Sequence, residues 1–286
     1  MRVKITRNTL IRLLTEYPFL WLATLLGIFP LYWLISNSLK TEAALFANPL
    51  APPSWPVVTG NWLNAWAGGP VNTPLIRPLL NSIGLTFSAV ALILIISSAA
   101  GYAFSRFQIY GGNLIFSFII MGLSVPIHAT LVPLVVLYNF IGILDTYFAL
   151  LLTFVAVNLP FSVLLMRAYF VSIPEEIAES ARIDGASEVR TFWSIMLPVA
   201  RPGLITMAIM NFLFVWNDFL YSYTLVSSRD FWTLPRAVYA FVGVYGLFSF
   251  TSLLAGMAIA VAPTLIIYFI FSKQLISGVA AGALKG

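Results

Sequence analysis

Half of the chain's carboxylates are concentrated in one short stretch. Residues 172–204, SIPEEIAESARIDGASEVRTFWSIMLPVARPGL, hold five of the ten acidic side chains. Carboxylates support acid–base catalysis when a nucleophile or another proton carrier lies within hydrogen-bond reach. The stretch has no histidine, no nucleophile–base pair and no phosphate-binding glycine loop, so its pattern favours a docking element over a catalytic site. The acidic residues are Glu175, Glu176, Glu179, Asp184 and Glu188.

The stretch is predicted to form two short helices joined at a glycine corner. Ser172 and Glu175 have capping-box spacing, so Ser172 is expected to cap the first helix. Gly185 is expected to end that helix in the left-handed conformation, and Ser187 to cap the second helix. The alternative to docking is an amphipathic hairpin that lies on the bilayer.

The two helices carry different surfaces. Small residues on the first helix let the backbone of another protein approach closely, whereas bulky residues on the second, spaced i, i+3, i+4, i+7, predict a buried stripe. The small residues are Ala178, Ser180 and Ala181, and the bulky ones are Val189, Phe192, Trp193 and Met196.

The rest of the chain is strongly apolar. Of its 286 residues 60% are hydrophobic and 9% are charged, whereas soluble domains average about 25% charged. Six apolar runs reach the roughly 20 residues that a spanning helix needs. Alternation with period two is absent from these runs, so the predicted fold is an all-α integral membrane bundle. The predicted spans are 17–39, 80–105, 114–138, 147–170, 203–226 and 251–272.

Basic residues set the predicted orientation. With the N-terminus in the cytoplasm, four of the fifteen lysines and arginines lie outside (Lys40, Arg77, Arg229 and Arg236) and the other eleven lie inside. Both termini are therefore expected in the cytoplasm, and nucleic-acid binding is not indicated. The predicted organisation is a cytoplasmic N-terminus at 1–16, a six-span transmembrane domain at 17–272 with an outer loop at 40–79 and a cytoplasmic loop at 171–202, and a cytoplasmic tail at 273–286. Within the tail, the stretch SGVAAGALKG at 277–286 is predicted to be small and flexible.

The charged stretch resembles a known motif. Permease subunits of binding-protein-dependent ATP-binding-cassette importers carry E-A-A, three residues, G, nine residues, I, one residue and L-P in a cytoplasmic loop. Every spacing matches here, and Ser180 is the one departure, at a position where another small residue is usual. The segments IPEEIAESARIDGAS, WNDFLYS and GVAAGALKG are similar to the carbohydrate-uptake, maltose-permease branch. The motif positions are Glu179, Ser180, Ala181, Gly185, Ile195, Leu197 and Pro198, and all except Ser180 match in residue type.

The resemblance implies a fold and a set of partners. It implies that residues 17–272 are the type I importer transmembrane domain of a permease in a bacterial inner membrane. Such a permease pairs with a second, homologous permease and receives a carbohydrate from an extracytoplasmic binding protein. A coupling helix at about Pro174–Asp184 would sit in a cleft of an ATPase dimer. The chain has no G-x-x-x-x-G-K-[ST] segment, so no cofactor is expected here, and ATP and magnesium are expected on the partner ATPase. The chain itself is expected to be non-catalytic.

Polar residues inside the spans are candidates for the sugar path. Asn211 and Asp218 are seven residues apart, which would place them on one helical face beside aromatic rings. The alternative is hydrogen bonding between helices, worth roughly 0.6 kcal/mol per contact. A lone histidine, His128, is expected to be packed or hydrogen-bonded, and it excludes a multi-histidine metal site. The candidates are His128, Asn158, Asn211, Trp216, Asn217, Asp218 and Tyr221.

Two other classes of membrane protein remain as alternatives. An ion-coupled secondary transporter of a polar solute usually carries acidic residues at mid-membrane and internal repeats, whereas Asp218 is the one acid in the predicted spans and no clear repeat is visible. An integral membrane enzyme needs acids or histidines clustered near one leaflet. Both are less consistent with the sequence than a permease subunit.

Overall fold

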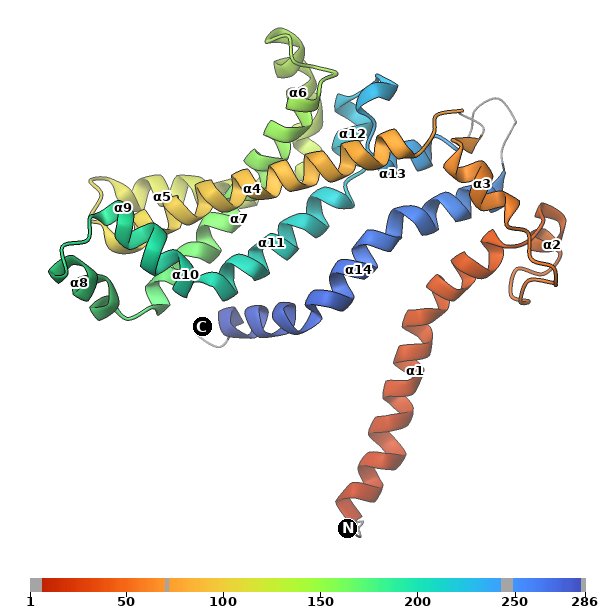
Figure 1. The fold of residues 1–286 in the computed structure, drawn as a ribbon, viewed down its shortest axis with the longest axis horizontal. Coiled ribbons are helices and arrows are strands. Elements are labelled where there is room, and N and C mark those ends of the chain that lie inside the picture. The colour runs from red at the N-terminus through yellow and green to blue at the C-terminus, as the bar shows by residue number, and fades with distance from the viewer. Residues whose placement is uncertain (1–6, 70–71, 243–248, 284–286) are drawn as a thin grey trace. The chain divides into compact units, whose positions relative to one another are not determined.

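The structure is a computed structural model that describes the backbone of residues 7–69, 72–242 and 249–283. It describes side chains over 17–69, 72–242 and 249–274. Within those ranges the chain is helical and contains no strand, as the all-α prediction requires (Figure 1). The chain forms two compact units, one made of Met1–Leu75 with Val238–Ala260 and the other of Ile76–Ala237 with Val261–Gly286. Residues 1–6 and 284–286 of the predicted termini lie outside the described residues.

The first unit contains the N-terminal span and most of the predicted outer loop. Helix α1 (Arg7–Ser38) is followed by two short helices, α2 (Glu42–Ala47) and α3 (Gly60–Trp66). A carboxylate oxygen of Glu42 accepts hydrogen bonds from the Ser249 hydroxyl at 2.9 Å and the Thr251 amide at 2.9 Å, which ties α2 to the start of α14 (Phe250–Ala283). The segment 40–79, predicted as a loop, is therefore partly helical.

The second unit is built around two long, closely packed helices, α4 (Ile76–Arg106) and α7 (Tyr147–Ser172). At Gly101 an added Cβ would lie 2.7 Å from the Met166 Cβ and 2.8 Å from the Arg167 amide nitrogen, so the two backbones touch with no room for a side chain. At the C-terminal end of α4, the Arg106 guanidinium donates to the carbonyls of Phe170 at 2.8 Å and Ile173 at 2.6 Å. It thereby satisfies orphan carbonyls at the C-terminal end of α7.

The predicted span 114–138 is broken. It consists of α5 (Gly112–Met121), the 3-10 turn η2 (Gly122–Ser124) and α6 (Ile127–Phe140), and the two parts are bent by 103°. The bend falls at Val125, which is extended with φ −80° and ψ 117° because it precedes Pro126.

The predicted span 203–226 is also interrupted. Helix α11 (Arg201–Trp216) ends at Asn217, and α12 (Leu220–Leu225) begins after Phe219. The prediction of one continuous helix through Asp218 is therefore wrong. The local reason is that both Asp218 carboxylate oxygens accept backbone amides of α12, from Tyr221 at 3.4 Å and Ser222 at 3.1 Å, and so cap a new helix.

Helices of sufficient length and hydropathy confirm a multi-pass membrane protein. Among the residues that the structure describes, four helices qualify singly. Two bent pairs, Gly112–Ser124 with Ile127–Phe140 and Glu188–Val199 with Arg201–Trp216, raise the number to six if each pair is one span. The tail predicted to be flexible at 277–286 instead continues α14 as helix to Ala283. The remaining elements are α8 (Glu175–Ile183), α9 (Glu188–Thr191), the π-helix η3 (Phe192–Met196), α10 (Leu197–Val199), the 3-10 turn η4 (Arg229–Phe231) and α13 (Leu234–Tyr239).

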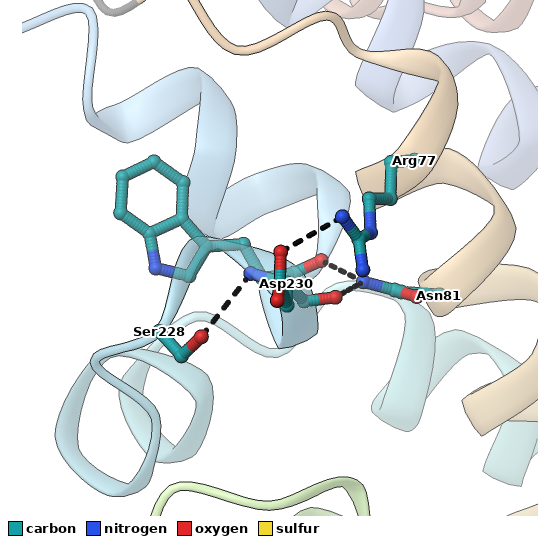
Figure 2. A network of polar contacts seen from close by, with 5 residues as sticks. Arg77, Asn81, Ser228 and Asp230 are labelled. Atoms are coloured by element: carbon teal, nitrogen blue, oxygen red, sulfur yellow. Dashed lines mark hydrogen bonds and ion pairs between the residues drawn. The ribbon is translucent and has the colours of Figure 1, made fainter.

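Opposite ends of α4 hold different segments of the second unit. Figure 2 shows the N-terminal end, where Arg77 pairs with Asp230 at 2.8 Å and the Asn81 amide donates to the Asp230 carbonyl at 2.8 Å. The loop around η4 is thereby attached to α4. Helices α8 and α9 lie beside the other end of α4 (Figure 1). Arg77 is predicted on the outer side of the membrane and Arg106 on the cytoplasmic side. The two arginines lie near opposite ends of α4, which is 31 residues long.

Replacing Gly101 by alanine is expected to loosen the contact between α4 and α7. The new methyl group would force the helices apart, at a cost of about 1–3 kcal/mol for overpacking. The thermal midpoint of the detergent-solubilised protein, followed by size-exclusion fluorescence, should fall. Gly84→Ala is the matched control in the same helix, because its Cβ would lie 3.6 Å from the Tyr147 hydroxyl, an ordinary contact. Equal midpoints for the two variants would contradict the close approach.

Candidate functional site

Helix α8 starts differently from the prediction. The Ser172 hydroxyl donates back to the Tyr169 carbonyl at 2.7 Å and belongs to the end of α7, so it does not cap α8. Pro174 is the N-cap residue and makes no side-chain capping bond. Glu175 and Glu176 occupy the first turn, where their charge is favourable beside the positive end of the helix dipole.

The end of α8 confirms the predicted role of Gly185. Its φ of +78° is the left-handed conformation that favours glycine. The Gly185 amide donates to the Arg182 carbonyl at 3.0 Å and the Ala186 amide donates to the Ala181 carbonyl at 2.9 Å, which is the Schellman pattern. Because both carbonyls are satisfied, the helix ends sharply and the chain turns directly into α9.

The second arm of the hairpin is also capped as predicted. The Ser187 hydroxyl accepts a hydrogen bond from the Arg190 amide at 3.3 Å and starts α9. The helix then widens into the π-turn η3 before α10, which contains Pro198. π-Turns are uncommon and frequently occur at functional sites. The chain bends by 76° where this arm meets α11.

The small residues of α8 face the interior of this chain. Ala178 and Ala181 are buried, and Ala178 packs in one cluster with Phe192 and Met196 of η3 and with Phe170 of α7. The prediction that these alanines form an open surface for a partner is therefore wrong. Their small size instead lets α8 lie close against the second arm.

The predicted buried stripe of the second arm is only half buried. Phe192 and Met196 lie in the interior cluster, but Val189 and Trp193 are 69% and 51% exposed. The i, i+3, i+4, i+7 spacing assumed one α-helix, whereas the π-turn η3 changes the residues per turn after Thr191. The two remaining positions therefore point away from the core.

The exposed face of the hairpin carries most of the motif. Glu179, Ser180, Asp184 and Gly185 are exposed, and the neighbouring Ile183 is 86% exposed. Three other motif residues support the fold from within: Ala181 is buried, and Ile195 and Leu197 are half-buried. Pro198 is exposed, between η3 and α11.

An ion pair closes the hairpin and connects it to α4. The Arg182 Nε donates to a Glu188 carboxylate oxygen at 2.7 Å, and the Tyr102 hydroxyl of α4 donates to the other oxygen at 3.3 Å. The Arg182 hydrogen bond is the main cause that holds the pKa of Glu188 below its ordinary value. The sequence gave no indication of Tyr102, because its contact joins residues 86 positions apart.

Two of the predicted path residues are structural. The Asn211 amide donates to the Ser162 hydroxyl of α7 at 3.1 Å and to the Met207 carbonyl at 2.9 Å, so it joins two helices. Trp216 is buried and stacks on Phe212 with an interplanar angle of 9°. For Asn211 the structure favours the alternative of interhelical hydrogen bonding, whereas Trp216 stacks on a residue of its own helix.

The predicted common face of Asn211 and Asp218 is not formed, because α11 ends between them. Asn217 is exposed and accepts a hydrogen bond from the Thr264 hydroxyl of α14 at 3.1 Å. The Asn158 amide donates within α7 to the Phe154 carbonyl at 2.8 Å. His128 is exposed in the first turn of α6, which differs from the packed histidine that was predicted.

Tyr221 is the path candidate with a distinctive environment. It is fully buried, and its hydroxyl is paired with the Thr130 hydroxyl of α6 at 3.0 Å. It borders a cavity together with residues that the sequence analysis passed over, among them Thr130, Tyr138 and Thr153. Threonine and tyrosine inside apolar runs were the available signal, but these residues are common in spans.

The fold is a helical membrane bundle with a capped, charged hairpin at one end. The chain belongs to the family described as the binding-protein-dependent transport system inner membrane component, whose model matches residues 93–280. The match includes the whole hairpin and most of the second unit.

Known proteins of this type resemble the chain over nearly its whole length. The diacetylchitobiose uptake system permease of Streptomyces coelicolor is 32% identical over 94% of this chain and 88% of its own. The trehalose/maltose transport system permease of Thermococcus litoralis is 31% identical over 93% and 94%. A solved bacterial ABC transporter involved in import of the acidic polysaccharide alginate has the same fold, with a TM-score of 0.80, 22% identity and coverage of 95% and 99%.

Acidification is expected to loosen the hairpin. Because the folded-state pKa of Glu188 is lowered, its stabilising contribution is present above the ordinary glutamate pKa and is lost as the pH falls through the lowered value. The pair is partly exposed, so the effect should be at most about 1 kcal/mol. Hydrogen exchange of residues 186–192, corrected for intrinsic rates, should show less protection at pH 3.5 than at pH 7.

Glu188→Gln should remove this pH dependence, and Glu176→Gln, on the exposed first turn of α8, should leave it in place. An unchanged pH dependence in Glu188→Gln would show that the ion pair does not order the hairpin.

Proposed function

We propose that this chain is the permease subunit of an ATP-binding-cassette importer for a carbohydrate. Family membership gives the transport role, and the two curated relatives are named for disaccharide uptake. The chain forms a translocation path with a second, homologous permease. An extracytoplasmic binding protein delivers the sugar to that path.

The observation that carries the proposal is the geometry of α8. It is a nine-residue helix with a Schellman end, an ion-paired neighbour and an exposed face of Glu175, Glu176, Glu179, Ser180 and Ile183. Its other face is packed against α7 and η3. A short helix held on one side transmits a displacement applied to the other side, which is what coupling to an ATPase requires.

The chemistry of ATP is assigned to partner chains. The ATPase dimer binds ATP and magnesium and grips α8 in a cleft, while this chain remains non-catalytic and binds no cofactor. Closure of the dimer moves the hairpin, and through Arg106 and Tyr102 that movement reaches α4 and α7. In the orientation that we propose, the hairpin and both termini lie in the cytoplasm. The spans then alternate between two discrete arrangements.

An ion-coupled secondary transporter is the weaker alternative. Such a protein needs an acid free to exchange protons or ions at mid-membrane. The one acid of the predicted spans, Asp218, accepts two backbone amides as a helix cap. That engagement favours a structural role for the carboxylate.

Gly185→Val is expected to uncouple ATP hydrolysis from transport. A β-branched residue at φ +78° is strained, and relief of the strain would unwind the end of α8. In proteoliposomes that hold the complete transporter, sugar uptake per ATP hydrolysed should fall at least about tenfold, an effect of about 1.4 kcal/mol. Gly142→Val is a matched control, because Gly142 has φ +75° and equally open surroundings but lies between α6 and α7.

Glu179→Lys should give the same uncoupling without backbone strain, because it reverses one charge on the exposed face of α8. Membrane insertion and co-purification with the second permease should be unaffected. Uptake per ATP equal to that of the unmodified transporter in both Gly185→Val and Glu179→Lys would refute the coupling role of α8.

A further inference from the structure

A cavity of about 230 Å³ lies within the second unit, where α6, α7 and α12 meet. It opens beside the bend of the broken span, since Gly122 and Val125 line it on one side and Pro160 of α7 on the other. Its walls hold two tyrosines and two threonines, Tyr138, Tyr221, Thr130 and Thr153. No charged side chain is among the lining residues.

The four hydroxyls form two separate pairs. Tyr138 is paired with Thr153 at 2.9 Å, and Tyr221 is paired with Thr130 at 3.0 Å. Tyr138, Thr153 and Tyr221 are 6%, 1% and 0% exposed, so water outside the protein does not solvate them. Each hydroxyl already has one hydrogen-bond partner in its pair, so the pairs remain stable without a ligand.

The direction of each hydrogen bond follows from the number of protons. A hydroxyl has one proton, and both threonines donate theirs to helix carbonyls: Thr153 to Ala149 at 2.7 Å and Thr130 to Ile127 at 2.6 Å. Each tyrosine must then donate its proton to its threonine. Both phenolic oxygens are left with lone pairs to accept hydrogen bonds and with no proton to give.

A fifth acceptor lies in the same wall. Pro160 has no amide proton, so the carbonyl of Ala156, which also lines the cavity, lacks its usual helical donor. The side-chain oxygens that line the cavity, together with the Ala156 carbonyl, are therefore hydrogen-bond acceptors. A ligand that pairs with these oxygens must bring the protons.

We propose that this cavity holds one ring of a neutral sugar and discriminates against acidic sugars. The inference rests on the proposed transport of carbohydrate and deepens it. A sugar hydroxyl donates to the phenolic oxygens of Tyr138 and Tyr221, and the rings and the aliphatic wall cover its apolar face. A carboxylate or sulfonate offers only acceptors, and it would face the acceptor oxygens of a cavity whose lining residues include no cationic side chain.

The size of the cavity limits the size of the ligand that it can hold. Pockets that enclose drug-sized ligands measure about 300–1,000 Å³, and 230 Å³ is smaller. One pyranose ring fits this limit, and a longer oligosaccharide would pass through the cavity ring by ring. The site is therefore a selective step on the path, separate from the binding protein that recognises the whole substrate.

The test uses the complete permease–ATPase complex in nanodiscs without its binding protein. Saturation-transfer NMR measures the Kd of methyl α-D-glucopyranoside and of its 6-carboxylate, methyl α-D-glucopyranosiduronic acid, at pH 7, and the galacto-configured pair is run in parallel. The neutral member of at least one pair should bind at least about tenfold more tightly than its acid, a difference of about 1.4 kcal/mol.

Three variants test the direction of the hydrogen bonds. Tyr138→Phe and Tyr221→Phe each remove one acceptor and should raise the Kd of the neutral probe about three- to tenfold. Thr153→Val removes the acceptor for the Tyr138 proton, so that this proton can be donated into the cavity. The ratio of the Kd of the acidic probe to that of the neutral probe should therefore decrease. Tyr147→Phe is the matched control, because the Tyr147 hydroxyl also bonds a hydroxyl of another helix, that of Ser88 at 3.3 Å, but does not line the cavity.

The outcomes separate this proposal from the proposed function. Equal affinity for the neutral and acidic probes, or a wild-type Kd in both phenylalanine variants, would overturn the cavity assignment even if the proteoliposomes import sugar. Proteoliposomes with the binding protein that take up neither maltose, trehalose nor chitobiose would instead count against carbohydrate transport itself.

Discussion

The contact of α4 with α7 at Gly101 is the constraint on which the second unit depends. Because no side chain separates the helices there, the two backbones form one rigid pair, and Arg106 locks the C-terminal end of α7 to α4. Both features that we propose to be functional, the hairpin and the cavity, are positioned by this pair of helices. The hairpin α8–α9 follows directly from the end of α7, and the hydroxyl-lined cavity lies beside the middle of the same helix.

The hairpin gains its rigidity from small residues and fixed ends. Buried Ala178 and Ala181 let α8 lie against η3, the Schellman end at Gly185 fixes its length, and the Arg182–Glu188 pair closes the turn. The same features leave one face of α8 uncovered. In the coupling proposed above, a displacement applied to that face would pass to α4 and α7, because the hairpin is held rigidly against them.

Three of the predicted spans depart from a regular helix. Pro126 bends one span by 103°, Asp218 starts a new helix in another, and Pro160 frees a carbonyl in α7. Irregular backbone at membrane depth is tolerated where it is buried in protein or lines a cavity. Here the bend and the freed carbonyl border the cavity that also receives Tyr221 of α12.

The sequence by itself determined the helical membrane class, the approximate spans, the hairpin with its Gly185 corner and the family, because these depend on local spacing and on apolar length. It did not determine which faces are buried. The partners of Ala178 and Tyr102, the interhelical bond of Asn211, and the hydroxyl pairs of Tyr138 and Tyr221 join residues distant in the chain. Only the packing of α4, α7 and α11 decides those contacts, since a periodic pattern shows that a face exists but not what lies against it.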